Sequence, residues 1–319
     1  MARSRTNPKK NSKPMRGRRK SVLPALLLAL LLAIGGLLGY MHLSARITHL
    51  NKAELYLPDL PAAFDGTKLI FLSDVNIRNE QDSAAVQRVL GKLTQLQPDL
   101  LILGGDYSAP TLMESLNGVS GGDTAKSRDF ISALADFPAP LGKFAVCGEN
   151  DDPAALQALF AASGVQLLED HCAQIKKDGS SLVIAGLSDS GRSQTHYEQI
   201  GGYFSGDECV IAVTHNPAGY VGVRVAEAKG GGAWADAVLA GHTLGGQINI
   251  LGRTLRTMPE AEKRCIGGWY YGDDLPMLVC EGLGCKGAML RLDSESEIWL
   301  ITLRKPAKGM NPQMVLPDF

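Results

Sequence analysis

The sequence of 319 residues has six cysteines but no CxxC pair. Because zinc ribbons take their ligands from such pairs, a zinc ribbon is not indicated. The chain also has no internal repeat. Its triple glycine at 230–232 lacks the strand and helix that flank a phosphate-binding loop, so it is interpreted as a connector.

Cations are scarce after residue 20. Nine of the 32 Lys and Arg residues lie in the first 20 positions, which leaves 23 against 33 acidic residues and a net charge of −10. An acidic body of this kind offers no basic face, so no nucleic acid is expected as a partner. The basic and polar residues 1–21 are predicted to form a disordered tail.

No Asp, Glu, Lys or Arg occurs between Val22 and Leu43, a stretch dominated by Leu and Ala. A transmembrane helix needs ~20 residues, whereas the apolar core of a cleaved signal peptide has ~7–15. We therefore predict a signal anchor at residues 22–43, with cleavage near Ala45 left open. The basic flank predicts a single-pass protein of the cell membrane, with a cytoplasmic N-terminus and an extracytoplasmic body.

The rest of the chain alternates apolar runs with amphipathic segments. Helices are expected at 83–97, at 127–137 and from Pro153 to about Gly164, with Asp152 as the N-cap of the last. Strands are expected at 68–74, 99–106, 143–149, 181–187, 209–215, 237–242, 277–280 and 297–303. Residues 108–126 are expected to be a Gly/Ser-rich loop. Continuously apolar strands predict an α/β domain with both sheet faces covered.

Five of these apolar runs end on a residue that can bind a metal. The five residues are Asp74, Asp106, Glu149, His215 and His242. Ligands of open α/β sheets collect at the carboxyl ends of the strands. A single Asp at a strand end often caps the next turn, but five such ends indicate a shared site. Carboxylates with imidazoles suit zinc, manganese or iron.

The order and spacing of these ends, from about residue 50 to residue 303, resemble the calcineurin-like metallophosphoesterases, and in particular their membrane-anchored bacterial members. The family pattern is D-x-H, G-D, G-N-H-[DE], H and G-H-x-H. The matching segments here are Asp74-Val-Asn76, Gly105-Asp106, Gly148-Glu-Asn-Asp151, His215-Asn-Pro217 and Gly241-His-Thr-Leu244. The resemblance implies that residues 46–304 form a four-layer sandwich of two mixed sheets flanked by helices, followed by a tail at 305–319.

The family's first metal site is degraded in this sequence. The resemblance implies that Asp74 and Asp106 remain as ligands, whereas Asn76 and Leu244 replace two histidines. Asn76 can offer a neutral oxygen to a cation, but Leu244 offers no ligand atom. A second bound metal is therefore doubtful.

The family's second metal site keeps a residue that can bind metal at each of its four ligand positions. The resemblance assigns it the ligands Asp106, Glu149, His215 and His242. Glu149 stands where the family has Asn, and its negative charge would strengthen binding. One divalent metal is therefore expected to bind firmly.

The family's catalytic histidine aligns with Asn150, which cannot act as a general acid. General acid–base catalysis typically contributes ~10²–10⁴-fold to a rate, so this replacement is costly unless another group substitutes. Shifting the alignment by one residue makes Asn150 the metal ligand and Asp151 the candidate acid. Both registers, with Glu149 or Asn150 as the ligand, remain open.

Two functions compete. The first is a membrane-anchored, metal-dependent phosphoesterase acting on phosphomonoester, phosphodiester or pyrophosphate bonds, with envelope lipids or nucleotide-linked sugars as candidate substrates. The second is a catalytically inactive relative that binds a metal, a phosphorylated ligand or a protein partner through the same edge. The complete metal site favours the first function, and the missing acid and ligands favour the second.

Overall fold

The computed structural model describes residues 22–188, 196–272 and 275–307. The chain divides into two units, Met1–Gly39 and Tyr40–Phe319. Helix α1 (Leu23–Ser44) is the one helix within the described ranges that is long and apolar enough to cross a membrane, with a mean hydropathy of 2.2. The predicted tail at 1–21 and most of the tail at 305–319 lie outside the described residues.

The first sheet has six strands in the order β1-β14-β2-β3-β4-β5. Neighbouring strands are parallel except β14 and β2, which are antiparallel. The strands are β1 (Thr48–Tyr56), β2 (Lys68–Leu72), β3 (Leu100–Leu103), β4 (Gly142–Ala145), β5 (Gln166–Leu167) and β14 (Ser296–Arg304).

The second sheet also has six strands, in the order β12-β13-β9-β8-β7-β6. Its inner pairs are parallel, and its two outer pairs, β12 with β13 and β7 with β6, are antiparallel. The strands are β6 (His171–Lys177), β7 (Ser180–Gly186), β8 (Val210–Val213), β9 (Ala237–Ala240), β12 (Gly268–Gly272) and β13 (Leu275–Val279). A small hairpin pairs β10 (Asn249–Ile250) with β11 (Arg253–Thr254).

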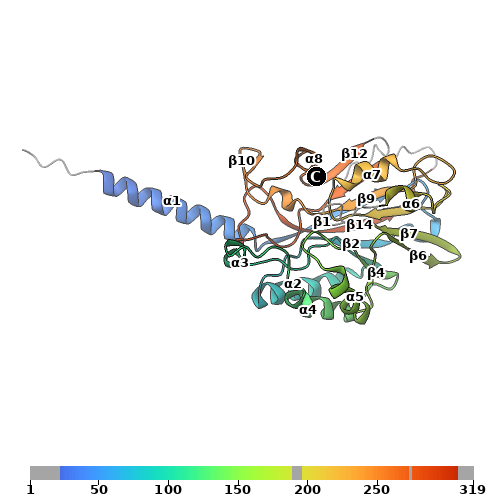
Figure 1. Ribbon diagram of the computed structural model, residues 1–319, viewed down its shortest axis with the longest axis horizontal. Helices are drawn as coiled ribbons and strands as arrows, with labels where there is room; N and C mark the ends of the chain where they lie inside the picture. The colour runs from blue at the N-terminus through green and yellow to red at the C-terminus, as the bar shows by residue number, and fades with distance from the viewer. Residues whose placement is uncertain (1–21, 189–195, 273–274, 308–319) are drawn as a thin grey trace, which may run out of the picture. The chain divides into compact units, whose positions relative to one another are not determined.

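Helices cover the outer faces of both sheets (Figure 1). On the first sheet lie α2 (Glu80–Leu93), α4 (Thr124–Ala133) and α5 (Pro153–Ala162), and on the second lie α6 (Tyr197–Gly201) and α7 (Gly219–Val225). The remaining short helices are α3 (Leu112–Leu116), α8 (Glu260–Lys263) and the 3-10 turns Ala62–Phe64, Thr94–Leu96, Leu134–Asp136 and Leu244–Gly246.

Side chains of one strand alternate between two buried layers. In β2, Leu69 and Phe71 join the apolar cluster between the two sheets, whereas Ile70 and Leu72 pack with the helices outside. Because successive side chains point to opposite faces of a sheet, a strand buried on both faces must be apolar throughout. The four-layer α/β sandwich is therefore confirmed.

Most of the predicted elements are present, with shifted ends. The N-cap at Asp152 and the Pro153 start of α5 are confirmed. Helix α2 begins at Glu80 rather than at residue 83, because the Asn79 side chain accepts the amide hydrogen of Asp82 at 3.0 Å. The expected loop at 108–126 is wrong in part, since Thr111 and Glu114 form a capping box that starts α3.

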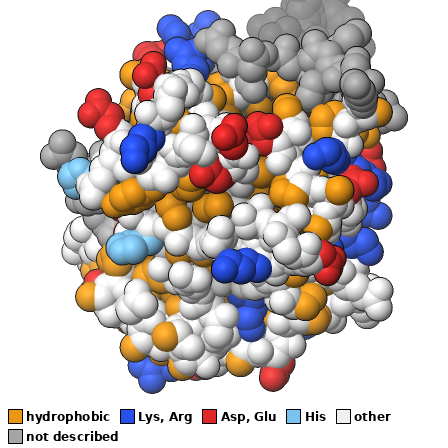
Figure 2. Space-filling view, turned by 90° about the vertical axis from the view of Figure 1, so that its right-hand side faces the viewer, with side chains coloured by type: hydrophobic (Ala, Val, Ile, Leu, Met, Phe, Trp, Pro, Cys, Tyr) orange, Lys and Arg blue, Asp and Glu red, His pale blue; other side chains and the backbone are white. Residues whose placement is uncertain are grey.

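Charges of both signs are mixed with apolar side chains on the face shown in Figure 2, which is the right-hand side of Figure 1. This face therefore presents a mixed rather than a basic surface.

One buried cation, Arg291, fastens the loop after β13 to the turn after β9. Its side chain is fully buried, and its two Nη atoms donate hydrogen bonds to carbonyl groups of the described residues. The acceptors are the backbone oxygens of Leu244 (3.2 Å), Glu281 (2.8 Å), Gly282 (2.9 Å), Gly284 (2.7 Å) and Glu295. Arg291 thus joins the backbone of the turn after β9 to the backbone of the loop after β13 at one edge of the sandwich.

Replacing Arg291 by Met is expected to lower the free energy of unfolding by at least about 3 kcal/mol. Each buried polar group left without a partner costs about 1–3 kcal/mol, and Met can satisfy none of these carbonyls. Urea unfolding of the full chain measures the loss, with Arg88→Met on the exposed face of α2 as the control. A loss for Arg291→Met no larger than the control's would contradict the fastening role.

Candidate functional site

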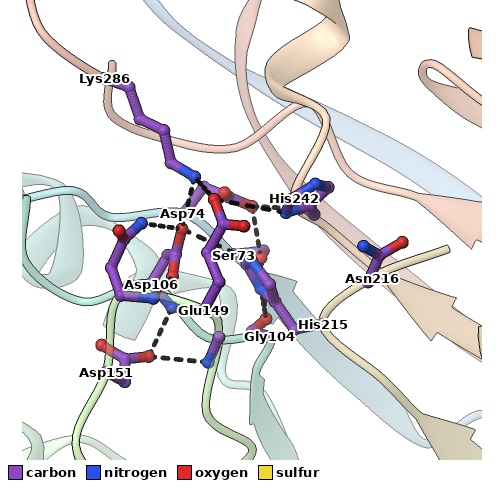
Figure 3. Close-up of polar contacts among 12 residues, drawn as sticks. Ser73, Asp74, Gly104, Asp106, Glu149, Asp151, His215, Asn216, His242 and Lys286 are labelled. Atoms are coloured by element: carbon purple, nitrogen blue, oxygen red, sulfur yellow. Dashed lines mark hydrogen bonds and ion pairs between the residues drawn. The ribbon is translucent and has the colours of Figure 1, made fainter. Parts of the chain in front are cut away.

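The five predicted strand ends lie at one edge of the sandwich, where loops of both sheets meet (Figure 3). Asp74, Asp106 and Glu149 follow β2, β3 and β4, and His215 and His242 follow β8 and β9. Asp74, Asp106 and His215 are buried and have candidate metal-ligand atoms that all lie within 4.8 Å of one another.

The backbone at this edge is strained. Asp74, Asp106 and His242 adopt left-handed conformations with φ of 51°, 56° and 73°. Such conformations cost free energy for residues other than glycine and tend to cluster at functional sites. Hydrogen bonds to neighbouring segments hold the backbone in these conformations. The Asp74 amide donates to Gly105 O at 2.9 Å, and the Gly241 amide donates to His215 O at 2.9 Å.

Two glycines allow the strand ends to approach one another. A Cβ at Gly241 would overlap the Ser73 hydroxyl, and a Cβ at Gly148 would overlap the Asp106 carboxylate. Only glycine fits at these positions without a shift of the backbone or of the site carboxylates.

Both histidines are oriented by partners behind them. Nδ1 of His215 lies 2.7 Å from Gly104 O, which leaves Nε2 directed towards Asp106 Oδ2 at 3.5 Å. Nε2 of His242 lies 3.3 Å from Glu262 Oε2, and its Nδ1 faces the site. A carboxylate or carbonyl behind a histidine selects the tautomer whose other nitrogen can bind a metal.

Asp106 is a fully buried carboxylate at the centre of the site. The backbone amide and side chain of Asn150 donate to its two oxygens at 2.9 and 2.7 Å. Burial favours the neutral acid, but nearby His215 and Lys286 outweigh it and hold the pKa of Asp106 well below its usual range. Asp106 is therefore an anion in the folded protein.

Glu149 is the most exposed of the predicted ligands, with 39% of its side chain accessible. One of its oxygens contacts the Lys286 ammonium and lies 3.9 Å from both His242 Nδ1 and Arg256 Nη2. Burial raises the pKa of Glu149, but Lys286 and His242 outweigh it, and the net pKa is lowered. Its carboxylate therefore points into the site, towards a cluster of cations.

Asp151 has its carboxylate occupied by backbone amides. Oδ2 accepts hydrogen bonds from the amides of Asp106 (2.7 Å) and Gly148 (2.9 Å), and Oδ1 accepts one from Tyr107 (3.0 Å). Burial and the charge of Asp106 raise the pKa of Asp151 to about 7. In this arrangement Asp151 joins the loops after β3 and β4, and the Asn150 side chain points to Asp106.

Asn76 and Leu244, which stand where the family's first metal site has histidines, differ in their surroundings. The side-chain oxygen and nitrogen of Asn76 are buried and form no hydrogen bond with the described residues. Leu244 is fully buried in a left-handed conformation with φ of 56°, which is unusual for a bulky side chain. An added Cβ at Gly282 would lie 3.1 Å from Leu244 Cδ2, so the leucine packs against this loop.

Sequence reasoning missed four polar residues of the site: Lys286, Glu262, Arg256 and Arg291. The Lys286 ammonium lies 3.1 Å from Asp106 Oδ2, and Arg256 donates to His242 O at 2.7 Å. None of these four residues belongs to a sequence motif with a recognisable spacing. The one available signal was the position of Lys286 just after Glu281-Gly-Leu-Gly284, a stretch that resembles the membrane-anchored members of the family.

The chain is similar in sequence to several known proteins. No family model matches the chain. An uncharacterized metallophosphoesterase of Aquifex aeolicus is 27% identical over 286 residues, covering 85% of this chain and 98% of that protein. The uncharacterized protein YpbG of Bacillus subtilis is 26% identical over 287 residues, covering 87% and 96%. UDP-2,3-diacylglucosamine pyrophosphatase LpxG of Chlamydia muridarum is 28% identical over 110 residues, covering 34% and 30%.

The chain is similar along most of its length to proteins named as metallophosphoesterases, at 22–27% identity. Several relatives named as metallophosphoesterases match it along most of its length, and the resemblance seen in the motifs is confirmed. These relatives support a metal-dependent phosphoesterase.

The residues at the sheet edge fit a divalent cation. Asp74 Oδ1, His242 Nδ1 and Asn76 Oδ1 are buried and form no hydrogen bond with the described residues. Buried polar atoms are normally paired, so three such atoms at one edge point to a missing partner of positive charge. With Asp106 and His215 they form a mixed oxygen and nitrogen set that suits zinc, manganese or iron.

Replacing Glu262 by Ala is expected to weaken metal binding about 10–100-fold, because His242 loses the carboxylate that orients it. Equilibrium dialysis of the full chain in detergent with Mn²⁺ measures the dissociation constant. Glu260→Ala is the matched control, since Glu260 lies on the same helix with an 80% exposed side chain. Equal affinity of the two variants would show that Glu262 has no positioning role.

Proposed function

We propose that this chain is a membrane-anchored phosphoesterase that hydrolyses a phosphate ester or pyrophosphate with one divalent cation. The buried cluster of Asp74, Asp106 and His215 supports this proposal most directly, since its candidate ligand atoms lie within 4.8 Å of one another. His242, Glu149 and Asn76 complete the set of donors around it. A cation there supplies a positive charge for phosphoryl oxygens and acidifies a bound water.

The chain's own residues have separate roles in this proposal. Asp151 holds the loops after β3 and β4 in place, because both of its oxygens accept backbone amides. Asn150 fixes the orientation of Asp106 and supplies no acidic proton. Glu149 is therefore proposed as the residue of this motif that faces the cation, which corresponds to the first of the two registers.

The proposed anchor is α1, with the basic residues before it on the cytoplasmic side and the phosphoesterase domain, residues 46–304, outside the cytoplasm. The length and hydropathy of α1 support this proposal. The substrate would then be a phosphorylated compound of the cell envelope. The similarity to a UDP-2,3-diacylglucosamine pyrophosphatase over 34% of the chain favours a lipid or nucleotide-linked pyrophosphate.

A second candidate function is that of a catalytically inactive relative that binds a metal or a phosphorylated ligand. Asn150 favours it, because an amide that donates to Asp106 replaces the family's histidine. The two candidates differ in turnover, so a hydrolysis assay separates them.

The full chain in detergent with Mn²⁺ is expected to hydrolyse bis(p-nitrophenyl) phosphate or p-nitrophenyl phosphate. His215→Ala removes a proposed ligand, so kcat/KM is expected to fall by more than the ~10–100-fold typical of losing an outer partner. His171→Ala is the control, because His171 is exposed on β6.

Turnover that depends on Mn²⁺ and on His215 supports the phosphoesterase. Metal binding without turnover of either ester or of a lipid pyrophosphate would favour the inactive relative instead. Turnover that His215→Ala leaves unchanged would contradict the assigned site.

A further inference from the structure

Lys286 is a cation that enters the metal site from the loop after β13. Its ammonium lies 3.1 Å from Asp106 Oδ2 and contacts Glu149 Oε1, and Figure 3 shows the side chain extending to these two carboxylates. Only 24% of the side chain is exposed. An ammonium held between two carboxylates stands where a metal ion that bridged them would bind.

The backbone of Lys286 is fixed by Gln247. The Gln247 side chain accepts the Lys286 amide hydrogen at 3.0 Å and donates to Lys286 O at 3.0 Å and to Ala288 O at 3.3 Å. Gly284, two residues earlier, has its carbonyl bound by Arg291 at 2.7 Å. Lys286 is therefore a positioned residue of the site rather than a freely moving surface lysine.

Lys286 competes for ligands that the family comparison assigned to a metal. Asp106 and Glu149 are two of the four members of the predicted complete site, with His215 and His242. An oxygen that binds the ammonium cannot also present the same lone pair to a metal ion in that position. The donors that remain clear of Lys286 include Asp74 Oδ1, Asn76 Oδ1 and His242 Nδ1, which are buried and form no hydrogen bond with the described residues.

Charge balance favours one metal beside this lysine. The Asp151 carboxylate is taken up by three backbone amides, and the site has three further carboxylates, Asp74, Asp106 and Glu149. One ammonium and one divalent cation neutralise them, whereas two divalent cations and the ammonium would leave an excess of positive charge at a largely buried position. Glu262 and Arg256, which flank His242, offset each other. Buried charges are tolerated when they are paired.

We infer that the Lys286 ammonium replaces one of the two metal ions of the family, so that this chain binds a single divalent cation beside it. The inference rests on the proposed function, since it specifies how the same site is filled. Both sites of the family are then altered: the first has lost a histidine at Leu244, and at the second a fixed organic cation on Asp106 and Glu149 takes over a metal's charge.

Metal content of the full chain in detergent tests this inference. Each protein is prepared with Mn²⁺, freed of excess metal by gel filtration, and measured by inductively coupled plasma mass spectrometry. The wild type is expected to hold one metal per chain, and Lys286→Met is expected to hold two. Lys126→Met removes a comparable ion pair outside the site, with Glu114 at 2.7 Å, and should stay at one. Lys286→Arg keeps the positive charge and should also stay at one.

Thermal melting gives a second readout that does not depend on turnover. After chelation, Lys286→Met is expected to melt at a lower temperature than the wild type, because Asp106 and Glu149 lose their cation. Added Mn²⁺ should then raise its melting temperature more than it raises that of the wild type or of Lys126→Met.

Two outcomes would overturn the inference and leave the metal-dependent function standing: two metals in the wild type, or one metal in both the wild type and Lys286→Met. An increase to two metals in Lys286→Arg would also overturn it. If neither the wild type nor Lys286→Met binds metal, the proposed function fails together with the inference.

Discussion

The buried carboxylate of Asp106 is the constraint on which the site depends. An anion taken fully out of water costs several kcal/mol unless hydrogen bonds and opposite charges compensate it. Asn150 supplies the hydrogen bonds, and His215 and Lys286 supply positive character from two other loops. The loops after β4, β8 and β13 are thus held at one edge of the sandwich by one charged group.

The architecture provides this edge by bringing together the carboxyl ends of strands from both sheets. Close approach requires glycine at 148 and 241 and left-handed backbone at Asp74 and Asp106. Arg291 compensates for part of this strain, because it binds the backbone oxygens of the turn after β9 and of the loop that carries Lys286. Stability and site geometry therefore depend on the same buried polar contacts.

The sequence alone was sufficient for the sandwich and the strand ends, because apolar runs that end on Asp, Glu or His are local features in a recognisable order. It was insufficient for Lys286 and Glu262. Lys286 meets Asp106 across 180 positions, and Glu262 meets His242 from a four-residue helix, with no spacing that marks either contact. The two registers at Glu149 and Asn150 were also indistinguishable, since they differ only in side-chain direction.

The most direct test of the account is the anomalous scattering of manganese in crystals of the full chain grown with Mn²⁺. The account predicts one peak per chain, about 2.0–2.3 Å from ligand atoms of Asp74, Asp106 and His215, with the Lys286 ammonium remaining between Asp106 and Glu149. Two peaks with Lys286 displaced into solvent would contradict the account, as would no peak at the strand ends.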